Sequence, residues 1–173
     1  MRSRERESLR LSKRRIEIWL PIVVVALDQL TKALVRAKVP EFASVTIVPG
    51  LINITHVRNT GVAYGFLDLT QFPFKTALIA GIGVLALVAV GIYAFSLARH
   101  QLLARVALSL VIGGAAGNLM DRITVGSVVD FVDVYRGAWH FWAFNVADSA
   151  ISVGVGIMIL DMLRTGAHVS KTV

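Results

Sequence analysis

The sequence predicts an α-helical integral membrane protein with four transmembrane helices, a small β-hairpin or sheet, and a loop over the same end of the helices. The first observation is composition: 55% of the 173 residues are hydrophobic and 17% are charged, where roughly 25% charged residues are typical of globular domains. The second is that four apolar segments reach about 20 residues, the length that crosses a bilayer. The third is a pair of alternating segments joined by a turn signal.

The predicted spans are residues 16–35, 74–98, 102–120 and 145–163. The first span follows a basic segment and could be taken for a secretory signal peptide. However, Asp28 and Lys32 interrupt it and no small-residue cleavage site follows, so we expect it to be retained. Because these two residues are four apart, one helical face carries both, and we expect a structural ion pair.

Lysine and arginine residues concentrate at one end of the predicted bundle. They are Arg2, Arg4, Arg6, Arg10, Lys13, Arg14, Arg15, Arg99, Arg105, Arg164 and Lys171. Basic residues flank transmembrane spans on the cytoplasmic side, so both termini are predicted to be cytoplasmic. The predicted organisation is a basic cytoplasmic tail (residues 1–15), a single four-span domain (16–164) and a cytoplasmic C-terminal tail (165–173).

Two segments between the spans show further patterns. Val45 and Ile47 alternate with polar neighbours, a Pro-Gly turn follows, and Ile52 and Ile54 alternate again, which predicts a β-hairpin. The segment before the fourth span is expected to be a loop with Asp133 as a solvated charge, like Arg136. It ends in aromatic residues of the kind that gather at membrane surfaces: Trp139, Phe141, Trp142 and Phe144.

The formal net charge of +7 is compatible with nucleic-acid binding, but its distribution favours a membrane anchor. The basic N-terminal segment directly precedes an apolar span and lacks interleaved aromatic residues, so anionic membrane lipid is its expected partner and nucleic acid is not. The chain has no cysteine, which excludes disulfides and thiolate metal sites. The histidines lack the spacing of metal ligands such as HExxH, and neither a metal nor a cofactor is predicted.

Three aspartates lie in apolar surroundings at the ends of predicted spans, where an ionised carboxylate costs about 2.5–3.5 kcal/mol even on the translocon scale. They are Asp121, Asp130 and Asp148. Singly, two of them have structural interpretations. Asp121, with Arg122, could end the third span at the headgroups, and Asp148 could be a first-turn acid that the helix dipole favours. Asp130 is expected in the loop that returns to the membrane.

Asp130 and Asp148 belong to segments that meet at one membrane face, and this pair suggests chemistry. Two carboxylates held close cannot easily both ionise, so the pair would share a proton near neutral pH. Such a pair suits peptide hydrolysis, with one aspartate as general base toward water and the other as general acid toward the scissile carbonyl. Ser127 and Ser149 are weaker candidates, because neither lies in a GxSxG motif.

Five motifs occur in the order, and on the four-span frame, of a known family. They are DQLTK in the first span, RNTGVAYGF after the hairpin, GGAAGNLMDR at the end of the third span, VVDFVDV, and FNVADSAI at the start of the fourth span. From about residue 16 to residue 163 the sequence resembles the lipoprotein signal peptidases, also called signal peptidase II, a family of bacterial intramembrane aspartyl peptidases.

The resemblance implies that Asp130 and Asp148 are the catalytic pair of an aspartic endopeptidase. It assigns site-lining or site-supporting roles, including substrate and inhibitor binding, to Asn59, Gly61, Asn118, Asp121, Arg122, Asn145, Asp28 and Lys32. The implied reaction removes signal peptides from diacylglyceryl-modified prolipoproteins, with the cut before the lipidated cysteine of the substrate. The cyclic peptide globomycin is an expected ligand. The implied location is the bacterial inner membrane with the active site at the periplasmic face, and we expect a monomer.

Two other classes of protein stay open from the residues alone. In a proton-coupled membrane transporter, Asp28, Lys32, Asp130 and Asp148 would form a relay, although no inverted repeat is visible. In a non-catalytic membrane assembly factor, the acids would only cap helices. The replacement Asp148→Asn separates a peptidase from a cap, because asparagine can cap a helix but cannot shuttle the proton.

Overall fold

The computed structural model describes residues 2–61, 74–98 and 100–169. In chain order the elements are α1 (Arg2–Lys38), β1 (Ser44–Val48), β2 (Ile52–Asn59), α2 (Lys75–Ser96), α3 (Leu102–Thr124), β3 (Val128–Arg136), β4 (Trp139–His140) and α4 (Val146–Val169). Residues 62–66 of the RNTGVAYGF motif and residues 170–173 of the predicted C-terminal tail lie outside the described residues.

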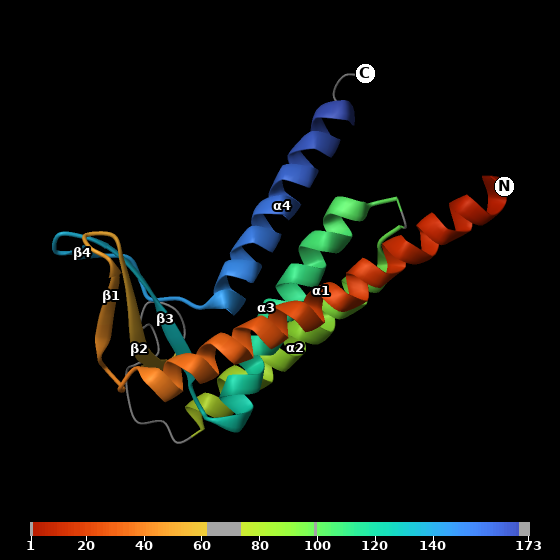
Figure 1. The fold of residues 1–173 in the computed structure, drawn as a ribbon. Helices are drawn as coiled ribbons and strands as arrows, with labels where there is room; N and C mark the ends of the chain where they lie inside the picture. Colours follow the sequence, from red (N-terminus) through yellow and green to blue (C-terminus); the bar gives the residue numbers. More distant parts are fainter. Residues whose placement is uncertain (1, 62–73, 99, 170–173) are drawn as a thin grey trace.

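The four predicted spans are confirmed. Within the described residues, the segments long and apolar enough to cross a membrane are Ile18–Lys38, Lys75–Ser96, Leu102–Thr124 and Val146–Arg164. α3 continues to Thr124, past the predicted end at residue 120, and the basic N-terminal segment is part of α1, which is helical from Arg2. The sheet lies at one end of the bundle, and α1 begins and α4 ends at the other (Figure 1).

Small residues let the helices pack closely around α3, which contacts α1, α2 and α4. A Cβ atom on Gly114 would overlap the carbonyl oxygen of Ala147 in α4, and one on Gly154 would lie 2.6 Å from the carbonyl oxygen of Ala107 in α3. Transmembrane helices associate through such small-residue contacts, because lipid supplies no hydrophobic force between them. α2 differs in that none of its residues is buried, which leaves most of its apolar surface for lipid.

The predicted hairpin is confirmed as β1 and β2, and it belongs to a larger antiparallel sheet in the order β1-β2-β3-β4. The segment predicted as a loop is strand β3, which pairs with β2 so that Val57 lies opposite Asp130 and Asn53 opposite Asp133. The register shifts between Ile54 and Val57, directly before the end of β2 that faces the helices. Such irregularities re-aim the side chains that follow them.

A hydrophobic cluster attaches the sheet to the bundle. Val35 of α1 and Val39, which directly follows α1, pack with Val129 and Phe131 of β3. Because successive side chains of a strand point to opposite faces, Asp130 between them points away from α1. The backbone of Phe144 then binds β3: its carbonyl accepts hydrogen bonds from the N–H groups of residues 131 and 132 at 3.0 and 2.8 Å. This bridge brings the start of α4 beside the central strand of the sheet.

Candidate active site

A cavity of about 1070 Å³ lies where the sheet meets α2, α3 and α4. Its polar lining includes Arg58, Asn59, Gly61, Asn118, Arg122, Asp130, Asp148, Ser149 and Ser152. Its apolar walls include Leu78, Ile79 and Ile82 of α2, Leu119 of α3, Ile151 and Val153 of α4, and Phe141, Trp142 and Phe144 of the segment before α4. The cavity therefore joins a polar region beside the sheet to an apolar region between the spans.

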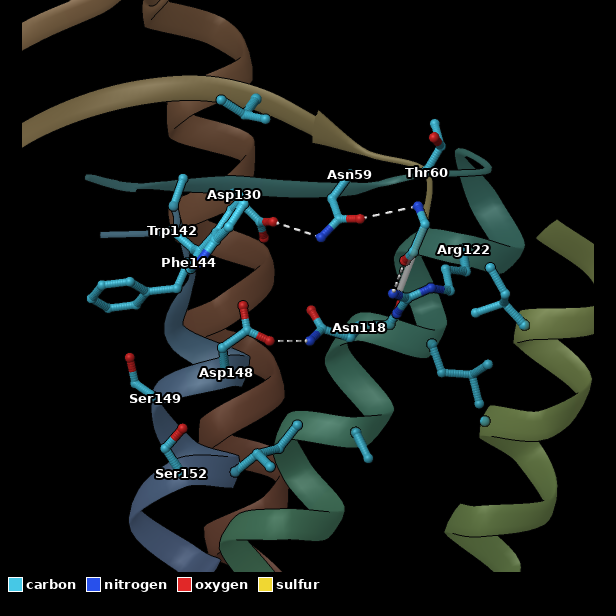
Figure 2. A pocket seen from close by; sticks show the side chains of 18 of the residues that line it. Asn59, Thr60, Asn118, Arg122, Asp130, Trp142, Phe144, Asp148, Ser149 and Ser152 are labelled. Carbon is cyan, nitrogen blue, oxygen red and sulfur yellow. Dashed lines mark hydrogen bonds between the residues drawn. The ribbon is translucent and has the colours of Figure 1, made fainter. Parts of the chain in front are cut away.

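The two aspartates predicted to act together line this cavity from different elements. Asp130 comes from β3 and Asp148 from the first turn of α4. Figure 2 shows their carboxyl groups pointing toward one another across the cavity. The strand pairing of β3 and its bridge to Phe144 thus place side chains 18 positions apart in the sequence at one point.

Asp130 is buried, with 4% of its surface exposed, and each of its carboxylate oxygens accepts one amide hydrogen bond. Asn59 Nδ2 donates to Oδ2 at 3.0 Å and Asn145 Nδ2 donates to Oδ1 at 2.7 Å. Burial raises the pKa of Asp130 to about 6; the Asn59 hydrogen bond opposes this shift, and the charge of Asp148 adds to it. The group therefore exchanges its proton close to neutral pH, as a general acid requires.

Asp148 is half-buried and is held by two donors. Asn118 Nδ2 of α3 donates to Oδ1 at 2.8 Å, and the backbone N–H of Asn145 donates to Oδ2 at 3.2 Å. The Asn145 side chain accepts a hydrogen bond from the backbone N–H of Asp148 at 2.9 Å, which completes a reciprocal cap. Asp148 therefore caps α4, as its structural interpretation predicted, and also presents its carboxylate to the cavity.

Arg122 and Gly61 form the side of the cavity opposite α4. The guanidinium donates to the backbone carbonyls of Asn118 at 3.3 Å and Gly61 at 3.4 Å. The Gly61 N–H donates to Asn59 Oδ1 at 3.0 Å, so this loop orients the amide that binds Asp130. Figure 2 shows Asn59, Arg122 and the two aspartates around one space.

A buried ion cluster lies beside the cavity. Lys32 Nζ is 2.7 Å from Asp28 Oδ2 and 2.8 Å from Asp121 Oδ2, and all three side chains are 1% exposed or less. The predicted Asp28–Lys32 pair is thus present. The interpretation of Asp121 as a headgroup-level terminator is wrong, because α3 continues past it and Lys32 pairs with it inside the bundle. Asp28 Oδ1 also accepts the backbone N–H of Ala147 at 3.0 Å, which ties α1 to the first turn of α4.

The prediction that Asp133 is a solvated loop charge is also wrong. Its side chain is only 12% exposed, and Asn53 Nδ2 donates to it at 3.0 Å. His140 Nδ1 of β4 lies 2.9 Å from its other carboxylate oxygen. Asp133 therefore joins β2, β3 and β4 and does not line the cavity, whereas Arg136 is exposed as expected.

All the residues that the resemblance singled out come together in the structure. Six of them line the cavity: Asn59, Gly61, Asn118, Arg122, Asp130 and Asp148. Asp28, Lys32 and Asp121 form the ion cluster, which Lys32 connects to Asn118 by a hydrogen bond. Asn145 donates to both Asn118 and Asp130. No group of three or more His, Asp or Glu side chains is arranged as metal ligands within residues 2–61, 74–98 and 100–169.

Two features of the site were missed from the sequence. Gln29 donates from Nε2 to Asp28 Oδ2, Asp121 Oδ1 and the Gly117 carbonyl, each at 3.2 Å, and so braces the ion cluster. Its position beside Asp28, a polar residue in an apolar span, was the available signal. The α2 wall of the cavity could not be predicted from the sequence, because its apolar residues are typical of any transmembrane span.

Comparisons with known proteins agree with this geometry. The family described as Signal peptidase (SPase) II matches residues 20–164. The chain is 44% identical over 149 residues to the lipoprotein signal peptidase of Geobacter metallireducens, covering 86% of this chain and 91% of that protein. It is 38% identical over 149 residues to that of Pseudomonas aeruginosa, covering 86% and 88%.

Solved structures of membrane enzymes share this fold. Two structures described as bacterial membrane enzymes superpose on this fold with TM-scores of 0.79 and 0.75. The first is 33% identical and the alignment covers 88% of this chain and 90% of that one; the second is 34% identical and covers 85% and 92%. With four apolar helices, a cavity between two facing aspartates, and a family match over most of its length, this multi-pass membrane protein belongs to the signal peptidase II family.

Proposed function

We propose that this protein is a membrane aspartyl endopeptidase that removes signal peptides from diacylglyceryl-modified prolipoproteins, cutting before the lipidated cysteine. The observation that carries the proposal is the facing pair Asp130 and Asp148 in a cavity that joins polar and apolar regions. Relatives that share 38–44% of its residues are lipoprotein signal peptidases. A lipid-anchored substrate would place its scissile bond at the membrane surface, where the sheet meets the spans.

The proposed reaction uses the two carboxyl groups in different protonation states. Asp148, ionised, takes a proton from a water molecule as the water oxygen bonds to the scissile carbonyl carbon. Asp130 acts in its protonated form, which burial favours by raising its pKa to about 6, and gives its proton to the carbonyl oxygen. The product of this step is a neutral tetrahedral diol, so no charge is left on the substrate in a largely apolar site.

Collapse of the diol returns both groups to their starting states. Asp148 passes the proton it holds to the amide nitrogen as the carbon–nitrogen bond breaks, and a diol hydroxyl returns its proton to Asp130. The products are a carboxyl group on the signal peptide and an amino group on the lipidated cysteine. The two carboxyl groups thus work as a unit.

The surroundings of the pair suit such a substrate. The Arg122 guanidinium lies on the cavity wall and can donate to peptide carbonyl groups of the bound chain. The α2 and α4 walls supply apolar surface for the signal peptide and the acyl chains. Globomycin is a cyclic and therefore conformationally constrained peptide, and it is proposed to occupy the same cavity.

The proposed location is the bacterial inner membrane, with both termini in the cytoplasm and the active site at the periplasmic face. Basic residues at the end of the bundle away from the sheet support this orientation, because they are disfavoured for translocation. We propose that the protein acts as a monomer, since both aspartates and their donors come from one chain.

Cleavage by purified protein tests this function. The enzyme in detergent is incubated with a prolipoprotein carrying the diacylglyceryl group and with the same prolipoprotein unmodified. We expect cleavage of the modified substrate before its lipidated cysteine, little cleavage of the unmodified one, and inhibition by globomycin. A folded protein that leaves the modified substrate intact would overturn the proposal.

A further inference from the structure

Lys32 makes a third contact that charge neutralisation does not require. Its ammonium group is fully buried, donates to Asp28 Oδ2 at 2.7 Å and forms an ion pair with Asp121 Oδ2, and it also donates to the uncharged Asn118 Oδ1 at 2.9 Å. An ammonium has three N–H donors and no acceptor. One donor of this buried ammonium is directed at the amide that binds Asp148.

This contact determines which end of the Asn118 amide faces the cavity. A lysine ammonium has donors and no acceptor, so the amide atom next to it must be the oxygen. The amide nitrogen then points the other way, where it donates to Asp148 Oδ1 at 2.8 Å. With the amide reversed, its NH₂ group would face the ammonium and its oxygen would face the carboxylate, and both contacts would be repulsive.

The same oxygen connects the second aspartate to Lys32. Asn145 Nδ2 lies 3.2 Å from Asn118 Oδ1 and 2.7 Å from Asp130 Oδ1. Because Asn118 Oδ1 accepts from both Lys32 and Asn145, the orientation of one amide supports the hydrogen bonds of both aspartates. Asn145 is fully buried and Asn118 is 9% exposed, so water is a poor substitute for these partners.

We propose that Lys32 is a positioning residue for catalysis: by fixing the orientation of the Asn118 amide it holds Asp148 in its working geometry. This inference rests on the proposed peptidase function and deepens it. It assigns to Lys32 a role separate from neutralising Asp28 and Asp121. A purely structural lysine would matter for folding and not for the rate of the folded enzyme.

The test removes the lysine without leaving a buried carboxylate unpaired. Lys32→Met alone would strand two buried carboxylates, a change that commonly unfolds a protein. Lys32→Met is therefore combined with Asp28→Asn, which leaves Asp121 with Arg36, whose guanidinium is 3.7 Å away. The matched control is Asp28→Asn alone, in which the ammonium still contacts Asn118. Both variants are compared for cleavage of the diacylglyceryl-modified prolipoprotein and for thermal unfolding in detergent.

We expect kcat of the double variant to be about 10- to 100-fold below that of Asp28→Asn, the effect of losing one hydrogen bond to a charged group. KM should change less than about twofold, because no group that contacts the substrate is altered. Adding Asn118→Leu should be non-additive: once the amide is gone, removal of Lys32 has no further route to Asp148.

Equal kcat values in the folded double variant and its control would overturn the positioning role while leaving the peptidase function intact. Absence of cleavage by the wild type would instead overturn the proposed function. If the double variant does not fold, the comparison is repeated with Asp121→Asn added to both proteins, which removes every charge of the cluster from the variant and leaves only the Lys32 ammonium in the control. The same drop in kcat is then expected, and its absence contradicts the proposal.

Discussion

Asp130 is subject to opposing influences that keep its proton exchangeable. Burial and the neighbouring charge of Asp148 favour the protonated form, while the amides of Asn59 and Asn145 favour the carboxylate, and the resulting pKa is about 6. A general acid with a pKa far above this value would hold its proton too tightly, and one at the ordinary value would have lost it. The two asparagines therefore tune the acid as well as orient it.

The Asn59 amide offers a direct test of this tuning. Asn59→Ala removes a hydrogen bond that lowers the pKa of Asp130, so that pKa should rise. The alkaline limb of kcat/KM against pH, where the protonated acid is lost, should move to higher pH. Asn53→Ala is the matched control, because its amide binds Asp133 outside the cavity. An alkaline limb that stays in place in Asn59→Ala would contradict the assignment of Asp130 as the acid.

Asp130 should also make the folded protein less stable as the pH rises. Its folded pKa of about 6 lies above the ordinary value of 3.8, so the folded state binds the proton more tightly. Stability is then lost between about pH 4 and 6, by about 3 kcal/mol if the whole shift is realised. Asp130→Asn removes this dependence. Melting temperatures in detergent should favour the variant increasingly from about pH 4 to 6 and by a nearly constant margin above that range, and parallel curves from pH 4 to 8 would contradict the shift.

For individual residues, the sequence predicted which ones form the site but not all of their surroundings. The motifs identified Asp130, Asp148 and their asparagine partners. For Asp121 and Asp133 the sequence predicted exposure to headgroups or solvent. A carboxylate near the end of a span is expected to be exposed unless its partner is known. Those partners, Lys32 and Asn53, are 89 and 80 positions away in the sequence, and only the fold brings them together.

At the scale of the elements, the contact between α3 and α4 sets the position of Asp148. A methyl group at Gly114 would overlap the carbonyl of Ala147, one residue before Asp148. Gly114→Ala should therefore push α4 from α3, lower stability by about 1–3 kcal/mol and reduce cleavage. Gly81→Ala in α2 is the control, since nothing lies within 4 Å of its position. Equal melting temperatures and rates for the two variants would contradict this packing.

The helices and the hairpin were predictable, but β3 was not. The spans and the β1–β2 hairpin carry local signals of length, hydropathy and turn residues. In β3, residues 128–131 and Asp133 are all buried, because one face packs on α1 and the other faces the cavity or neighbouring strands. A strand buried on both faces shows no alternation of polar and apolar residues, so the segment read as a loop.

The sheet and both aspartates lie at one end of the spans, and the basic start of α1 lies at the other. The chain has no cysteine, so single cysteines report topology cleanly. Thr46 in β1 and His100 between α2 and α3 are both exposed and lie at opposite ends of the helix bundle, so each is replaced by cysteine (Thr46→Cys and His100→Cys). A membrane-impermeant maleimide added to spheroplasts should label residue 46, and residue 100 only after permeabilisation. The reverse pattern would contradict the proposed orientation.

In the proposed reaction Asp130 and Asp148 together perform the cleavage. Wild type, Asp130→Asn, Asp148→Asn and Asp133→Asn are purified in detergent, checked for folding by thermal melts, and assayed on the diacylglyceryl-modified prolipoprotein. Asp133 is the matched control, because it lies in the same strand as Asp130 but does not line the cavity.

We expect cleavage by the wild type and Asp133→Asn, and a loss of about 100-fold or more in each of the other two folded variants, since asparagine can neither accept nor deliver the proton. Cleavage at the wild-type rate by folded Asp130→Asn or Asp148→Asn would contradict the account.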